Sequence, residues 1–154
     1  MEHAPASLDR AGLAAVRQCA CFNIRKAARA VTQRYDDHLR PTGLRATQFS
    51  LLTVLAVMEK ATISELAERA VMDRTTLKRN LELLEEQGLV RIRPGDDARV
   101  REVTLTRAAH QRVAEALPYW QAAQLEMITG LGESRFQRLL TDLSSTVASA
   151  HQEG

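Results

Sequence analysis

The sequence predicts a mainly α-helical chain with a small β-hairpin, an α+β fold, and three observations support this prediction. Apolar residues recur at three- and four-residue steps over most of the 154 residues, a spacing typical of amphipathic helices. Residues 62–87 carry the start and stop signals of two helices joined by a short turn. Residues 89–105 alternate between apolar and polar positions on both sides of a turn-forming segment, as a hairpin does.

The first element is expected to be one long helix over residues 13–39. Its apolar positions are Leu13, Val16, Ala20, Ile24, Ala27, Val31, Tyr35 and Leu39. Pro41 and Gly43 should end it, because proline lacks an N–H donor and glycine readily adopts the left-handed conformation. The next helix is expected to begin at Thr47, whose hydroxyl can cap it. The apolar positions of this helix are Phe49, Leu52, Leu55 and Met58.

A pair of short helices follows, and each has a recognisable start. Thr62 and Glu65 have the spacing of a capping box, in which each side chain accepts a hydrogen bond from the backbone N–H of the other residue. Asp73 can cap the second helix, and Gly88 can end it. This second helix is therefore expected over about residues 74–87. The buried faces should comprise Ile63, Leu66, Ala67 and Ala70 in the first helix and Leu77, Leu81 and Leu84 in the second.

The outward face of the second helix has an unusual order of charges. Thr75, Lys78 and Arg79 project away from the leucines at about 100° per residue, and Arg74 lies on their flank. This order opposes the helix macrodipole, which favours anions near the N-terminus. The acids come later, at Glu82, Glu85 and Glu86. Basic and hydroxyl side chains at this end can bind phosphates and base edges in the major groove of DNA. The alternative is a solvated face whose charge order is accidental.

The hairpin carries further basic residues. Residues 89–93 and 101–105 read as half-buried strands, and residues 94–98 between them are turn-forming. Arg99 and Arg101 lie just past the tip, where an arginine can enter the minor groove; an ordinary solvated turn is the alternative. A helix pair followed by such a hairpin is a winged helix-turn-helix. Its basic side chains are Arg74, Lys78, Arg79, Arg91, Arg93, Arg99 and Arg101.

Further helices are expected on the C-terminal side of the hairpin. An alanine-rich helix should run on until Pro118 kinks or interrupts it. Gly130 and Gly132 should separate this helix from a final one. The apolar positions of the final helix are Phe136, Leu139, Leu140, Leu143 and Val147.

The helices at both ends are too amphipathic to stand alone, and packing against a second copy of the chain would bury their apolar faces. We therefore expect residues 9–40 and 107–150 to form a dimerisation region. Residues 45–106 should form the DNA-binding region. A homodimer with two such regions predicts a palindromic site on double-stranded DNA.

Several segments of the chain resemble the MarR family of bacterial transcriptional regulators. They are residues 66–69 (LAER), 73–76 (DRTT), 84–90 (LEEQGLV) and 97–99 (DAR) followed by 103–106 (VTLT). The resemblance extends over nearly the whole chain and implies a homodimeric regulator, more often a repressor than an activator. It implies that the wing residue Arg99 enters the minor groove. It also implies that the major groove is read by Arg74, Thr75, Thr76, Lys78 and Arg79.

Three positions depart from the family pattern. Val71 occupies a turn where the family often has glycine, and Ala98 replaces the first arginine of a usual Asp-Arg-Arg. Ala109 replaces a common glycine after the Leu-Thr pair. The first two departures bear on the geometry of the turn and on the strength of the wing contact.

Composition excludes several other classes of protein. The formal net charge is only +2, from 21 basic and 19 acidic residues, so affinity for DNA must come from local clustering of charge. No apolar run approaches a membrane span, and the N-terminal ten residues lack a signal-peptide core, so a cytoplasmic location is expected. In that reducing compartment the two cysteines should be free thiols.

The two cysteines are the first candidates for sensing a signal. On one continuous helix, Cys19 and Cys21 would point about 200° apart, so they could not share a metal or close a disulfide. Cys21-Phe22 and the residues after it resemble the organic-hydroperoxide-sensing branch of the MarR family, which implies oxidation of Cys21 to a sulfenic acid and release of DNA. The tyrosines of that branch are absent here, because their positions hold Arg25, Ala46 and Phe49. A plain buried thiol is the alternative.

A second sensing hypothesis is a small aromatic or phenolic ligand between the dimerisation helices and the DNA-binding region. Its candidate lining residues are Phe22, Arg25, Phe49 and Trp120, although aromatic residues at helical spacing are more often ordinary core.

Other chemistry finds little support in the sequence. The four histidines lack the spacing of metal ligands, and no phosphate-binding glycine loop or nucleophile motif is present, so we expect neither an enzyme nor a cofactor. The remaining rival is a winged-helix module that serves protein contacts alone. Such a module would tolerate the loss of Arg79 and Arg99.

Overall fold

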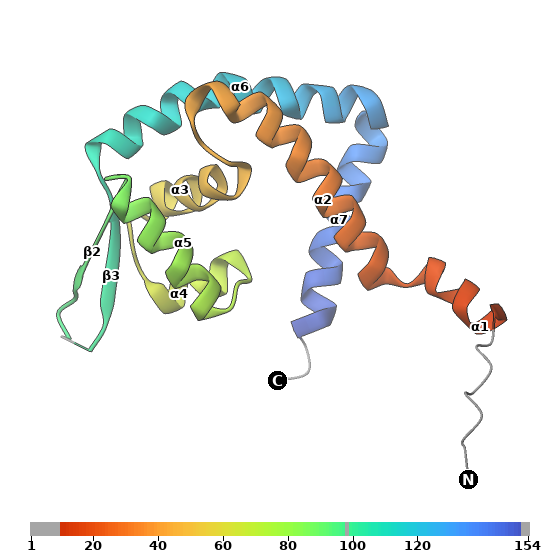
Figure 1. The fold of residues 1–154 in the computed structure, drawn as a ribbon, viewed down its shortest axis with the longest axis horizontal. Coiled ribbons are helices and arrows are strands. Elements are labelled where there is room, and N and C mark those ends of the chain that lie inside the picture. Colours follow the sequence, from red (N-terminus) through yellow and green to blue (C-terminus); the bar gives the residue numbers. More distant parts are fainter. Residues whose placement is uncertain (1–9, 98, 152–154) are drawn as a thin grey trace, which may run out of the picture. The chain divides into compact units, whose positions relative to one another are not determined.

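The computed structural model describes residues 10–97 and 99–151, and the chain divides into two compact units between Arg34 and Tyr35. In the first unit, helix α1 (Arg10–Ala15) leads into a 3-10 turn (Val16–Gln18) and then into most of α2 (Ala20–Leu39). The second unit contains the end of α2 and every later element (Figure 1). The prediction of a mainly helical α+β fold is confirmed. No helix of the described residues is long and apolar enough to cross a membrane.

The prediction of one continuous helix over residues 13–39 is wrong, because the helix breaks at Cys19. The backbone of Cys19 is extended, with φ −64° and ψ 120°. The side-chain amide of Asn23 donates to the carbonyl oxygens of Arg17 at 2.8 Å and of Cys19 at 2.9 Å. A polar side chain that satisfies backbone groups in this way competes with the regular helical ladder, and apolar periodicity does not report it.

Helix α2 ends as predicted. Its last residue is Leu39, and a 3-10 turn (Arg40–Thr42) containing Pro41 follows. Gly43 then adopts the left-handed conformation, with φ 73°.

The start of α3 (Ala46–Met58) corrects the expectation that Thr47 caps it. Thr47 lies inside the first turn, and Arg45 is the N-cap residue. The side chain of Gln48 accepts from the Arg45 N–H at 3.0 Å, and the carboxylate of Asp36 accepts from the Ala46 N–H at 2.7 Å. Asp36 comes from α2, ten residues earlier, so the cap depends on a contact between helices that no local pattern reveals.

The last turn of α2 is tied to α6 as well as to α3. The hydroxyl of Tyr35 donates to the side chain of Gln124, and burial raises the pKa of this tyrosine. His38 Nε2 lies 3.1 Å from a carboxylate oxygen of Glu126. With the Asp36 contacts, the end of α2 is therefore fixed to both neighbouring helices.

The predicted helix pair forms as α4 (Ile63–Ala70) and α5 (Arg74–Glu86), and its start signals are confirmed. The Glu65 N–H donates to the Thr62 hydroxyl at 3.1 Å, and the Thr62 N–H donates to the Glu65 carboxylate at 2.7 Å. The Thr76 N–H donates to the Asp73 carboxylate at 2.8 Å. Hydrogen bonds from Thr62 lower the pKa of Glu65, and those from Thr76 lower the pKa of Asp73. Both carboxylates are thus held in the charged form that caps a helix.

The hairpin forms from β2 (Val90–Pro94) and β3 (Arg101–Leu105), but the sheet has a further strand that the sequence did not predict. Strand β1 (Lys60–Thr62) pairs with the other edge of β3, giving the order β1-β3-β2 among the described residues. Ala61 lies opposite Val103, which lies opposite Ile92. Three residues are too few to show the alternation that identifies a strand.

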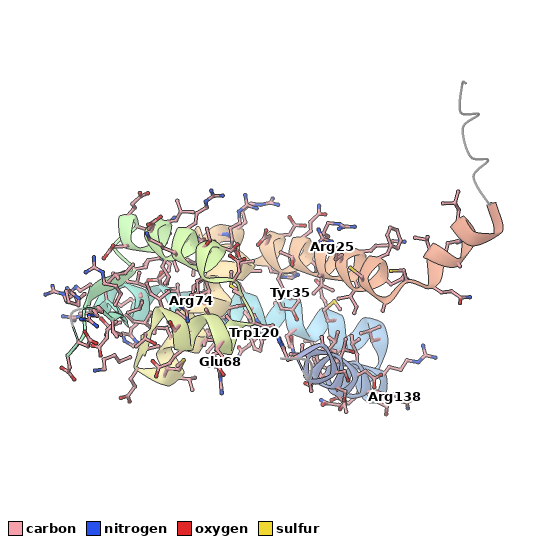
Figure 2. All side chains as sticks on the ribbon, turned by 90° about the horizontal axis from the view of Figure 1, so that it is seen from below. Arg25, Tyr35, Glu68, Arg74, Trp120 and Arg138 are labelled. Atoms are coloured by element: carbon pink, nitrogen blue, oxygen red, sulfur yellow. The ribbon has the colours of Figure 1, made fainter. Side chains whose placement is uncertain are left out.

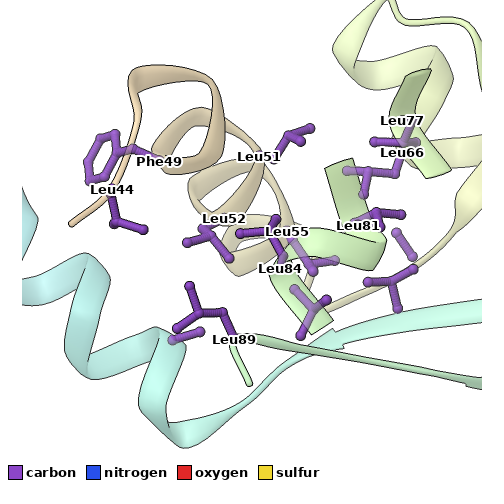
Figure 3. Close-up of a cluster of buried hydrophobic side chains, with 14 of the residues drawn as sticks. Leu44, Phe49, Leu51, Leu52, Leu55, Leu66, Leu77, Leu81, Leu84 and Leu89 are labelled. Atoms are coloured by element: carbon purple, nitrogen blue, oxygen red, sulfur yellow. The ribbon is translucent and has the colours of Figure 1, made fainter. Parts of the chain in front are cut away.

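The core of the second unit lies where α3, α4 and α5 meet the sheet and α6 (Figure 3). The predicted leucines of α5 are all buried, as are Leu66 and Ala67 of α4. The ring of Phe49 stacks on that of Trp120, with centroids 6.2 Å apart. The largest side chains with less than 2% exposure are Leu39, Leu52, Leu55, Leu66, Leu77, Leu81, Leu84, Val90 and Val103.

The C-terminal helices are α6 (Arg107–Leu131) and α7 (Glu133–His151). Pro118 does not interrupt α6, because Pro118 and Ala114, four residues earlier, are both exposed and water can reach the carbonyl that loses its partner. Gly130 lies inside α6, so only Gly132, with φ 81°, separates the two helices. Apolar side chains of α7 remain exposed in this single chain: Leu139, Leu140, Leu143 and Val147.

Val71 in the turn between α4 and α5 should be a site where glycine stabilises the protein. Its φ of 52° and ψ of 47° are left-handed, which costs a residue with a Cβ about 1–2 kcal/mol. The side chain is 52% exposed, so little packing is lost on its removal. We expect Val71→Gly to raise the free energy of unfolding by about 0.5–1 kcal/mol in urea titrations, after the greater chain entropy of glycine is subtracted.

The matched control is Val57→Gly in α3. Val57 is 79% exposed but helical, so the same change should lower the free energy of unfolding by about 0.5 kcal/mol. Equal losses in the two variants would show that the backbone of Val71 is not strained.

Candidate nucleic-acid interface

The N-terminal end of α5 presents the residues predicted to contact DNA. The Asp73 cap fixes the first turn of the helix, and the burial of Leu77, Leu81 and Leu84 fixes which face points outward. The side chains predicted to contact DNA are all exposed, and Figure 2 labels Arg74: Arg74, Thr75, Thr76, Lys78 and Arg79. This end of the helix therefore offers three cations and two hydroxyls to a ligand.

The acidic residues of α5 begin at Glu82, after its first two turns. In the described part of the chain, one ion pair involves a basic residue of α5. It joins Lys78 Nζ to a carboxylate oxygen of Glu82, at 3.8 Å. Both side chains are more than half exposed, so the pair is weak and leaves Lys78 available to an anion. The Asp73 carboxylate already accepts from the Thr76 N–H at this end of the helix, so the positive potential here comes from the basic side chains.

The tip of the β2–β3 hairpin is a defined turn. The Gly95 N–H donates to the Val100 carbonyl at 2.8 Å, and the Val100 N–H donates to the Asp97 carbonyl at 2.9 Å. The Asp97 side chain accepts from the Arg99 N–H at 2.9 Å, so it fixes the backbone from which the Arg99 side chain extends. Ala98, the position that departs from the family pattern, lies outside the described residues.

The basic side chains of the hairpin are exposed: Arg91, Arg93, Arg99 and Arg101. Figure 1 shows the hairpin projecting beyond helices α3 to α5. Glu102 of β3 lies 2.9 Å from Lys60 Nζ of β1, and this hydrogen bond raises the pKa of Lys60. The hairpin therefore adds four exposed cations to those of α5.

Two contacts that the sequence did not reveal connect the hairpin to α5. The hydroxyl of Thr106 donates to the Gly88 carbonyl at 2.7 Å and also accepts from the Ala109 N–H, so it caps α6 and anchors the base of the hairpin. The carboxylate of Glu85 accepts from the Ile92 N–H at 2.9 Å. The helix and the hairpin are therefore held together by hydrogen bonds as well as by the core.

The cysteines lie in the first unit, and both are free and exposed. Cys21 is in the first turn of α2, whereas Cys19 precedes the helix in an extended conformation. The geometric argument that two residues of one helix point about 200° apart therefore does not apply to this pair, and the exclusion of joint chemistry between Cys19 and Cys21 does not hold.

The four candidate pocket residues are divided between the two units. Phe22, 49% exposed, and Arg25, also exposed, belong to α2 in the first unit. Phe49 is buried in the second unit, where it stacks on Trp120. No group of three or more His, Cys, Asp or Glu side chains in the described parts of the chain is arranged to hold a metal ion.

Comparisons with known proteins agree with this architecture. The model of the MarR family matches residues 42–100. The uncharacterized HTH-type transcriptional regulator YwoH of Bacillus subtilis (strain 168) is 32% identical over 92 residues, which span 60% of this chain and 67% of YwoH.

Two solved structures of DNA complexes are also similar. The M. tuberculosis transcriptional regulator MosR in complex with DNA is 40% identical, covers 86% of this chain and 98% of its own, and has a TM-score of 0.76. A mutant of E. coli MarR complexed with operator DNA covers 86% of this chain and 96% of its own, with a TM-score of 0.77. At 21% identity, this second structure supports the fold alone.

Proposed function

Because the chain belongs to the MarR family of transcriptional regulators, we propose that it binds double-stranded DNA of specific sequence as a homodimer. The observation that carries this proposal is that basic side chains of α5 and of the hairpin are exposed, on elements whose apolar faces are buried in one core. The solved complex of MosR with DNA, at 40% identity, supports the binding of DNA.

In the proposed complex, α5 enters the major groove with its N-terminal end. Thr75, Lys78 and Arg79 are the residues for base edges, while Arg74 and Thr76 are suited to phosphates. Arg99 enters the minor groove, where negative potential is concentrated, and Arg101 lies beside the phosphate backbone of the DNA.

The homodimer is supported by the exposed apolar side chains of α7. Leu140, Leu143 and Val147 follow one another at three- and four-residue steps, and each is 40–44% exposed in the single chain. A second copy would remove this stripe from water. Two DNA-binding regions related by two-fold symmetry would then favour a palindromic operator.

The proposal is tested by selecting sequences from a pool of random DNA duplexes with the purified full-length protein. We expect enrichment of a two-fold symmetric sequence whose half-sites lie about one helical turn apart. The rival, a winged-helix module for protein contacts alone, predicts no enrichment over the starting pool.

We further propose that the protein is a repressor and that oxidation of Cys21 releases it from DNA. The exposure of this thiol supports access of an organic hydroperoxide. The Cys21 thiolate would attack the peroxide, the O–O bond would break, and the products would be a sulfenic acid and an alcohol. The ties from Tyr35, Asp36 and His38 to α3 and α6 give α2 a route to the DNA-binding elements.

Cys21→Ser should abolish the release of enriched DNA by cumene hydroperoxide while leaving binding under reducing conditions within about twofold of wild type. The matched control is Cys19→Ser, which removes the other exposed thiol and should still respond. Gel-shift titration with and without the peroxide measures both variants. Unchanged release by Cys21→Ser would exclude oxidation of Cys21 as the trigger.

A further inference from the structure

We propose that Glu85 is a positioning residue that sets the placement of the hairpin relative to α5, so that one chain can engage both grooves of DNA together. This inference rests on the proposed function. In this proposal Glu85 does not itself contact DNA. From its charge alone, an acidic residue close to the DNA phosphates would be expected to weaken binding.

The geometry gives this carboxylate a specific partner. Strand β2 is an edge of the sheet, since the order is β1-β3-β2, so one row of its backbone groups faces away from β3. The Ile92 N–H belongs to that row and donates to Glu85 Oε1 at 2.9 Å. A charged acceptor makes this hydrogen bond stronger than a neutral one would be.

The position of the contact makes it suited to controlling the hairpin. Thr106 anchors the base of the hairpin, at Gly88 and Leu89, and β1 holds β3 by pairing with its residues 102–104. Glu85 holds the opposite edge of the sheet, strand β2, at Ile92, and so resists rotation of the hairpin about β3. The tip extends about three residues, or about 10 Å, beyond Ile92, so a rotation of about 17° would move it by about 3 Å. That displacement is enough to take Arg99 out of hydrogen-bonding reach of a groove.

A charge-based role predicts the opposite behaviour. If Glu85 acted only through its charge, its removal would strengthen DNA binding, because one negative charge would leave the cationic surface. If Glu85 positions the hairpin, its removal weakens DNA binding, because Arg99 is displaced from its groove. The neighbouring Glu86, exposed and with the same charge, offers a control on the same helix.

The test is a double-mutant cycle on binding of the full-length protein to the enriched duplex, followed by fluorescence anisotropy. We expect Glu85→Ala to weaken binding about five- to tenfold, because a displaced Arg99 loses part of its contact with the minor groove. Glu85→Gln retains an acceptor and should lie within about twofold of wild type. Glu86→Ala should bind as tightly as wild type or more tightly. In an Arg99→Ala background, adding Glu85→Ala should weaken binding by less than about twofold.

Three results would overturn the proposal: Glu85→Ala behaving like Glu86→Ala, Glu85→Gln failing as Glu85→Ala does, or a full loss from Glu85→Ala when Arg99 is already absent. Amide hydrogen exchange reports the tether without DNA, because Glu85→Ala should speed exchange at Ile92 while leaving Leu81 in the core protected. A wild-type protein that binds no duplex would instead overturn the proposed function itself.

Discussion

Replacing Arg79 and Arg99 together by alanine should weaken binding to the enriched duplex by about 100-fold or more. Each side chain is assigned contacts worth about 1–3 kcal/mol, and a homodimer loses every contact twice. The loss should be accompanied by a shallower dependence of the Kd on salt, because fewer counterions are released when the variant binds. Anisotropy titrations at several salt concentrations measure both effects.

The matched control is the double variant Arg135→Ala and Arg138→Ala, which removes the same charge from α7. In Figure 2, Arg138 lies well apart from Arg74 within the second unit. This control should bind within about threefold of wild type, because a change of net charge away from the contact surface alters the affinity for DNA only weakly. If both double variants lost affinity equally, bulk charge would explain binding and the assigned contacts would be wrong.

Leu81→Ala should lower the free energy of unfolding by about 2–5 kcal/mol. Leu81 is 1% exposed on the inner face of α5. Its truncation leaves a cavity beneath the helix that carries the residues proposed to contact DNA. Small domains are stable by only about 5–15 kcal/mol, so the change should also reduce the fraction of protein competent to bind DNA at 37 °C. Urea unfolding followed by circular dichroism measures the loss.

Leu83→Ala on the same helix is the control, because Leu83 is 46% exposed. Its loss should remain under about 1 kcal/mol. A similar loss in both leucine variants would contradict the assignment of the buried face of α5, and with it the identity of the outward-facing residues.

Local signals explain which parts of this molecule were predictable from its sequence. The Thr62–Glu65 capping box and the Asp73 cap depend on residues within one turn, and both form as expected. The leucine stripe of α5 depends only on helical spacing, and it is buried as expected. The outward face of α5 follows directly from these two features, so the arrangement of its basic residues is predictable from the amino-acid sequence alone.

Contacts between distant segments explain what could not be predicted. The cap that Asp36 gives to α3 requires two helices to meet, and β1 becomes a strand only by pairing with β3, some forty residues later. The Glu85–Ile92 hydrogen bond likewise appears only once the hairpin has folded back beside α5. None of these contacts has a pattern that is visible within a few residues.

The break at Cys19 shows a different limit. The apolar positions on both sides keep a helical spacing, but Asn23 takes the backbone carbonyls of Arg17 and Cys19 with its side chain. Cys19 therefore lies outside the helix, and the helical geometry that would keep the two thiols apart does not apply to them.

The central claim is that the exposed cationic surface of α5 and the hairpin binds DNA, and the salt dependence of wild-type binding tests it most directly. Titration of the enriched duplex between about 50 and 200 mM salt should show a linear fall of log K with log salt, with a total loss of about a thousandfold or more if six or more phosphates are neutralised. The Arg79→Ala, Arg99→Ala double variant should show a shallower slope. An affinity for the duplex that is absent, or that does not change with salt, would contradict the claim.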